Sequence, residues 1–166
     1  MIKYIERTRA YYAAQGYPAY SWASYSDTPF APMLKPLAES RVALMTTAAP
    51  HRPEHYIEPD TGPDARYNAD LKFFEVFTAP IDPRPDLRIS HIGYDRKHCA
   101  AEDSRTWLPI DALKEAREIG TIGDLCDELI GIPTNRSQRV TLEQDAPRAL
   151  QEVENLGADV ALLVPT

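Results

Sequence analysis

The stretch Asp145-Ala-Pro-Arg-Ala-Leu-Gln-Glu-Val-Glu-Asn-Leu-Gly-Ala-Asp-Val-Ala-Leu-Leu-Val164 decides the fold class. Its first half predicts a helix with Asp145 as the N-cap and Gly157 as the stop. The residues expected to face a sheet are Ala146, Leu150, Val153 and Leu156. Its second half is an apolar run of the kind found in strands covered on both faces. A helix, a short loop and a buried strand make half of a βαβ unit, so the sequence predicts an α/β fold.

Three apolar runs in the chain each lead into a polar cluster. Arg41–Thr46 leads into Thr47-Ala-Ala-Pro-His51, Leu87–Ser90 into His91-Ile-Gly-Tyr-Asp95, and Val160–Val164 into Pro165-Thr166. We expect strands 41–47, 87–90 and 159–164 to be parallel in an open, mostly parallel three-layer sheet of Rossmann or flavodoxin type. The three clusters would then meet at the carboxyl edge, where open α/β sheets bind ligands.

Composition sets broad limits. The 166 residues are 43% hydrophobic and 26% charged, which suits one ordinary globular domain. A net charge of −7 argues against nucleic acid or an anionic membrane as the main partner. The sequence contains neither an 18-residue apolar run nor a signal-peptide core, so we expect a cytoplasmic protein. In that compartment Cys99 and Cys126 are expected to be free thiols.

The domain organisation is uneven along the chain. Residues 1–40 are expected to form an N-terminal helix, over residues 2–14, and an ordered arm rich in proline and aromatic residues. The arm either packs over the sheet or another subunit, or forms an aromatic wall of a ligand pocket. Residues 41–166 would form the α/β domain, with an edge strand over 71–77 and a helix over 111–118. A segment or chain following Thr166 is expected to complete it.

The cluster His91-Ile-Gly-Tyr-Asp95-Arg-Lys-His-Cys99 concentrates groups that exchange protons near neutral pH. We interpret His91, Tyr94 and Asp95 as candidate catalytic or substrate-binding residues. Two alternatives stay open: hydrogen-bonded residues with a structural role, and a small metal-binding protein that uses His91, His98 and Cys99. No paired metal-ligand motif supports a metal site, and the absence of GxGxxG and GxxxxGK[ST] gives no support to dinucleotide or P-loop binding.

The strand tip after residue 46 offers a second set of polar groups. Thr46, Thr47 and His51 are placed to bind a carboxylate or an amine of a small substrate. Pro53 prevents His51 and His55 from sharing a helix face in a zinc-binding HExxH arrangement. Asp111 is expected to be structural.

Several of these segments, taken in order, resemble one enzyme family. They are Pro29-Phe-Ala-Pro-Met-Leu-Lys-Pro36 with the following strand to Thr47, Ser90-His91-x-x-Tyr94-Asp95, Asp103, Pro109-Ile-Asp111-x-Leu113, and Gly157 to Thr166. Together they resemble the amino-terminal part of the glycine/sarcosine/betaine/D-proline reductase family, of the selenoprotein-B type, over about residues 29–166.

The resemblance implies an oxidoreductase that cleaves a C–N bond of an amine or amino acid derivative. In the family a selenocysteine or cysteine follows the strand that matches Val160–Thr166, and a partner subunit often carries a pyruvoyl group. The chain itself would hold no cofactor, and Thr166 would mark the boundary of the redox or cleavage site. We therefore expect the substrate-binding half of a reductase that acts with a second polypeptide or a C-terminal segment. The alternative is a non-catalytic subunit that stabilises another reductase component.

Overall fold

The computed structural model describes residues 3–19, 22–51, 71–91, 93–95, 97–134 and 137–166. The chain divides into two compact units, Met1–Ala31 and Pro32–Thr166. The first unit contains α1 (Tyr4–Ala14), the helix predicted at the N-terminus. In the same unit, the Arg9 guanidinium lies 5.7 Å from the centre of the Trp22 ring, a cation–π contact.

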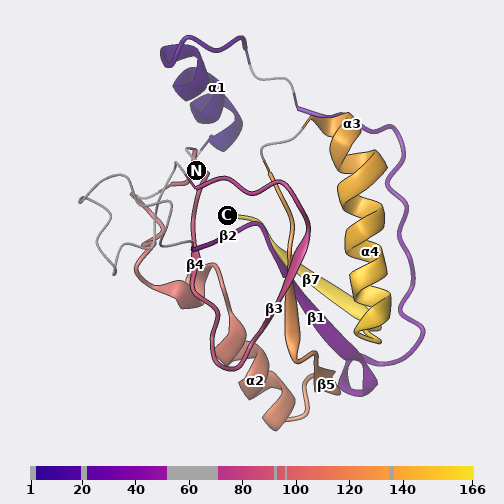
Figure 1. The fold of residues 1–166 in the computed structure, drawn as a ribbon. Coiled ribbons are helices and arrows are strands. Elements are labelled where there is room, and N and C mark those ends of the chain that lie inside the picture. The colour runs from indigo at the N-terminus through magenta and orange to yellow at the C-terminus, as the bar shows by residue number, and fades with distance from the viewer. Residues whose placement is uncertain (1–2, 20–21, 52–70, 92, 96, 135–136) are drawn as a thin grey trace. The chain divides into compact units, whose positions relative to one another are not determined.

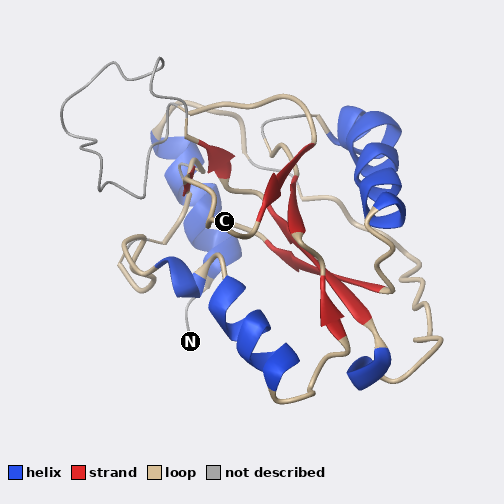
Figure 2. Cartoon of the chain, turned by 60° about the horizontal axis from the view of Figure 1, so that its bottom comes forward, coloured by secondary structure: helices blue, strands red, loops and turns tan. Residues whose placement is uncertain are grey.

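The second unit contains the sheets and the remaining helices (Figures 1 and 2). Its strands are β1 (Arg41–Thr46), β2 (Ala49–Pro50), β3 (Phe77–Pro80), β4 (Leu87–Arg88), β5 (Asp124–Leu125), β6 (Glu128–Gly131) and β7 (Val160–Val164). Its helical segments are η1 (Leu37–Glu39), η3 (Ser104–Thr106), α2 (Ile110–Glu118), α3 (Gln138–Val140), η4 (Thr141–Asp145) and α4 (Ala146–Asn155).

Strand β1 is the centre of the main sheet. It pairs in parallel with β7, from Val42 opposite Val160 to Thr46 opposite Val164. On its other side β1 pairs in parallel with β5 near its start and with β6 near its end. Strand β3 then pairs with β6 in the antiparallel sense. The sheet is thus mixed and mostly parallel, and the predicted α/β class and the parallel pairing of the first and last predicted strands are confirmed.

Helices cover both faces of this sheet, with α2 on one side and α4 on the other (Figures 1 and 2). The larger core cluster joins Val42 and Leu44 of β1 to Ile110 and Leu113 of α2. Helix α2 coincides with the helix predicted over residues 111–118, and Pro109 precedes it as the N-cap. On the other face α4 buries Ala149.

The strand predicted at 87–90 does not belong to the main sheet. Its β4 portion pairs with β2 in a separate two-stranded antiparallel sheet, Ala49 opposite Arg88 and Pro50 opposite Leu87. The prediction of a parallel strand there is wrong, because β4 pairs with β2, which follows β1 closely in the sequence and lies outside the main sheet. Strands β5 and β6 take the place beside β1 instead.

Three other predictions need correction. The edge strand predicted over 71–77 begins only at Phe77, since the residues before it form no strand. The helix expected to start at Asp145 starts at Gln138, where the Ser137 side chain accepts a hydrogen bond from the Val140 N–H. It continues through the π-helical turn η4 into α4, so Asp145 is a buried residue inside it. The run 160–164, expected to be buried, is half-buried or exposed throughout.

Candidate functional site

The carboxyl ends of the parallel strands form one edge of the main sheet. Thr46 lies opposite Val164 of β7 and opposite Gly131 of β6, and Gly131 lies opposite Phe77 of β3. Because β3 is antiparallel, its beginning rather than its end lies at this edge. The residues just after Thr46 and Val164, and those just before Phe77, therefore gather in one region.

Two threonines join the strand tips at this edge. The backbone N–H of Thr166 donates a hydrogen bond to Oγ1 of Thr47 over 2.8 Å, and the two Oγ1 atoms lie 3.1 Å apart. The predicted convergence of the clusters after strands 41–47 and 159–164 is therefore confirmed. Thr46 has a different role, since its buried hydroxyl accepts a hydrogen bond from the Ala48 N–H at 3.1 Å.

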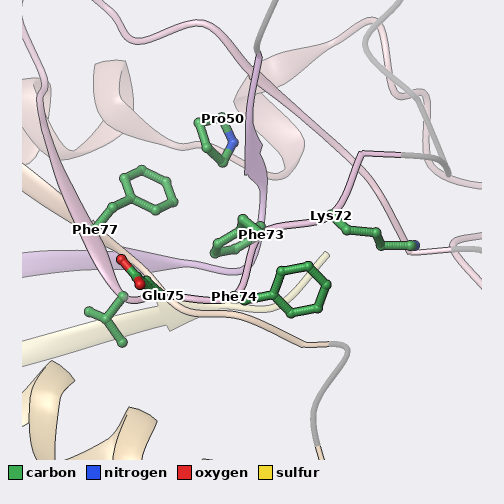
Figure 3. Close-up of a pocket in the computed structure, with 7 residues that line it drawn as sticks. Pro50, Lys72, Phe73, Phe74, Glu75 and Phe77 are labelled. Atoms are coloured by element: carbon green, nitrogen blue, oxygen red, sulfur yellow. The ribbon is translucent and has the colours of Figure 1, made fainter. Parts of the chain in front are cut away.

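A cavity of about 430 Å³ lies in this region (Figure 3). Its lining residues are Pro50, Lys72, Phe73, Phe74, Glu75, Val76 and Phe77. The rings of Phe73 and Phe77 meet edge to face with centroids 5.4 Å apart, an arrangement that aromatic pairs favour. Figure 3 shows Lys72 and Glu75 on either side of Phe73 and Phe74 in this view, so the apolar wall carries one charge of each sign.

The segment Phe74–Val76 also lines a second cavity, of about 370 Å³, beside the long helix that α3, η4 and α4 form together. Gln144, Asp145 and Arg148 form the rest of its lining. The π-helical turn η4 thus ends at a cavity wall, and π-helical turns occur frequently at functional sites. Phe74, with 54% of its surface exposed, borders both cavities.

The Phe77 side of the cavity depends on Gly131. A Cβ atom placed on Gly131 would overlap the Phe77 ring, so the ring rests directly against the β6 backbone. Phe77 is also the residue through which the two core clusters of the unit touch, since it packs against both. The glycine therefore fixes the position of an aromatic ring that shapes the site.

His91 does not line the cavity, but it interacts electrostatically with Lys72, which does. Burial lowers its pKa below the ordinary value, and the positive charge of Lys72, which lines the cavity, lowers the pKa further. Its Nδ1 accepts a hydrogen bond from the Gly93 N–H at 3.1 Å. That bond assigns the proton of the neutral ring to Nε2. Both influences on the pKa of His91 favour the neutral imidazole.

The local chain direction also brings His91 back toward the strand tip. Because β4 runs antiparallel to β2, the residues that follow Arg88 return in the direction of Thr47 and Ala48. Ile89 and Ala48 are both fully buried in the larger core cluster. Next to this strand pair, the half-buried His51 donates its backbone N–H to the Asp86 carbonyl at 2.9 Å.

Tyr94 and Asp95 have extensive contacts with the protein. Tyr94 packs against the larger core cluster, and its burial raises the pKa of its phenol. The buried Asp95 carboxylate accepts hydrogen bonds from Nδ1 of His98 at 2.7 Å and from the Lys97 N–H at 3.2 Å. These contacts fit the structural alternative for Asp95, in which it fixes the turn that follows His91.

The cysteines and histidines do not form a metal centre in the part of the chain that the structure describes. No three His, Cys, Asp or Glu side chains among those residues are grouped so that they could hold a metal ion. His98 is paired with Asp95, and the Gly93 N–H holds Nδ1 of His91. Cys99 and Cys126 are free thiols, as predicted, and burial raises the pKa of Cys126.

Sequence reasoning missed the cavity-lining segment 72–77. The aromatic run was interpreted as a strand because Phe and Val favour strands. A usable signal was present. Phe73 and Phe74 stand side by side between Lys72 and Glu75, so the alternation of apolar and polar residues that marks a half-buried strand is missing.

Comparison with known proteins gives one weak similarity. The chain is 24% identical over 153 residues to the glycine reductase complex component B subunit gamma of Symbiobacterium thermophilum. The chain is a distant relative of that subunit. The match covers 89% of this chain and 33% of the relative, so the chain spans about a third of the relative's length. No protein-family profile and no solved structure matches. Within the described residues, no helix is both long and apolar enough to span a membrane.

Proposed function

We propose that this chain is the substrate-binding part of a reductase that cleaves a C–N bond of a small amine or amino acid derivative. The observation that carries the proposal is the aromatic cavity beside the joined tips of β1 and β7, at the edge where open α/β sheets bind ligands. The distant similarity to a glycine reductase component supports the reductase class.

The cavity residues suit a small ligand that carries both charges. Lys72 would attract a carboxylate, and Glu75 together with the faces of Phe73 and Phe74 would attract a substituted ammonium group. Thr47 and Thr166 add hydroxyl and backbone groups at the strand tips. His91 would keep a proton on Nε2 and stay uncharged, which avoids repulsion with Lys72.

The redox group would come from outside this chain. The family resemblance suggests a selenocysteine or cysteine in a segment after Thr166, or a pyruvoyl group on a second polypeptide. A selenol or thiol at that place would supply the electrons for bond cleavage. The side chains of this chain would bind and orient the substrate and exclude water from it.

Ligand titration tests the proposal on the intact chain. Calorimetric titrations with glycine, sarcosine, glycine betaine and D-proline should show binding of at least one of them. Phe74→Ala should weaken that binding at least tenfold, because Phe74 borders the cavity. Ile119→Ala is the matched control, since Ile119 is an exposed apolar residue at the end of α2. Unchanged binding in Phe74→Ala would contradict the site, and no binding of any probe would contradict the substrate class.

A second candidate function is a non-catalytic subunit that stabilises another reductase component. The first unit favours it, since α1 buries none of its residues and Tyr17, Tyr25 and Phe30 are exposed. Aromatic residues exposed in this way are typical of protein contact surfaces. The titration distinguishes the two functions, because a purely stabilising subunit would bind none of the four amines.

A further inference from the structure

Strand β7 has the composition of a buried strand but is not buried. Its five residues, Val-Ala-Leu-Leu-Val, are all apolar. Yet Leu162 is 40% and Leu163 52% exposed, and Ala161 between Val160 and Leu162 is exposed as well. Parallel strands with continuous apolar runs normally lie in sheets covered on both faces. The composition of β7 and its exposure therefore do not match.

The exposure affects both faces of β7. Leu162 lies opposite Leu44, whose side chain is buried in the core cluster that α2 completes, so Leu162 is on the α2 face. Leu163 is on the opposite face, the one on which α4 lies (Figure 1). Neither helix covers its leucine. A single helix docked on one face would therefore leave the other leucine in water.

The outer edge of β7 is open as well. Among the described residues, β7 pairs with β1 alone. Proteins usually protect such an edge with a charged residue, a proline or a bulge, and Val160–Val164 contains no charged residue or proline. An edge without these features can accept a further strand.

We propose that β7 pairs with a parallel apolar strand from a further α/β segment of the reductase. Such a strand would bond to the open edge, and its flanking helices would cover Leu162 on one face and Leu163 on the other. The relative supports this occupant, because two thirds of its length lie outside the matched part. A parallel strand would also end beside Thr166, so its following loop would complete the proposed site. The inference rests on the proposed function for the identity of the partner.

The probe is the part of the Symbiobacterium thermophilum subunit that lies outside the matched region, made as a separate chain and mixed with this one. Sedimentation should show a 1:1 complex. Amide hydrogen exchange in Val160–Val164 should slow at least tenfold in that complex. Leu163→Lys should weaken the complex at least tenfold, whereas Ile119→Lys, at a residue 72% exposed on α2, should leave it unchanged.

Three outcomes would overturn the inference. They are no complex, a complex in which exchange of the β7 amides is unchanged, and a homodimer of this chain that itself protects β7, which would make a second copy the occupant. None of these readouts needs turnover. A protected β7 without amine binding would therefore refute the proposed function and leave the docking surface in place.

Discussion

Gly131 controls the position of an aromatic ring at the candidate site. Gly131→Ala should destabilise the protein by about 1–3 kcal/mol, because the new methyl group overlaps the Phe77 ring. Urea unfolding measures the change. In a Phe77→Ala background the same substitution should cost much less, since the ring is then gone. An equal cost in both backgrounds would show that the ring is not the cause.

His91 should make stability depend on pH. Its pKa is lower in the folded than in the unfolded chain, so the unfolded chain binds the proton more readily. The contribution of His91 to the free energy of unfolding is complete above its unfolded pKa of about 6.5. It is lost as the pH falls toward the pKa of the folded chain.

His91→Gln removes this titrating group. Between pH 7.5 and pH 5.5, wild type should therefore lose more unfolding free energy than His91→Gln, measured by urea unfolding. His51→Gln is a useful comparison, since the half-buried His51 directly follows β2, the partner strand of β4. Equal losses in wild type and His91→Gln would contradict a lowered pKa at His91.

The long helix shows how an element differs from its apparent sequence boundary. Asp145 has the residue type and the following proline expected of a helix start, but the helix begins with Ser137 as its N-cap. Pro147 has no N–H to donate to the Glu143 carbonyl, and the turn before it is π-helical rather than α-helical. A helix can therefore continue through residues whose types are typical of a helix N-terminus.

Ser137→Ala should cost about 1 kcal/mol of unfolding free energy, because the Val140 N–H loses its side-chain acceptor. Ser137→Asp should retain most of the stability, since aspartate caps equally well. Thermal unfolding followed by circular dichroism measures both. A neutral Ser137→Ala would show that the cap contributes little to this helix.

Continuous apolar runs were sufficient to predict β1 and β7. The helical spacing of Leu113 and Ala116, after Pro109, was sufficient to predict α2. The same reasoning missed β5 and β6. Each is short, and Asp124, Asp127 and Glu128 interrupt their apolar residues. The position of β6 beside β1 results from tertiary pairing, which the local sequence pattern does not encode. The direction of β4 also depended on its partner, since β2 is only two residues long.

At the scale of the molecule, the sequence predicted the strand tips at the site but not the aromatic segment that lines its cavity. The meeting of Thr47 and Thr166 followed from parallel strands of matching direction. The cavity depends on how an irregular segment, Lys72–Val76, folds beside the sheet edge, and no periodic signal encodes that.

Removal of residues 1–31 tests whether the second unit folds by itself. Both core clusters lie within Pro32–Thr166, and α1 buries none of its residues. The truncated chain should therefore keep its unfolding free energy to within about 0.5 kcal/mol in urea, as changes to exposed residues usually do. Leu44→Ala in the full chain is the comparison, because deletion of a fully buried leucine side chain costs about 2–5 kcal/mol. A truncation that cost as much as Leu44→Ala would show that the first unit contributes to the fold. Its exposed aromatic residues would then belong to the stability of this chain and not to a contact with a partner.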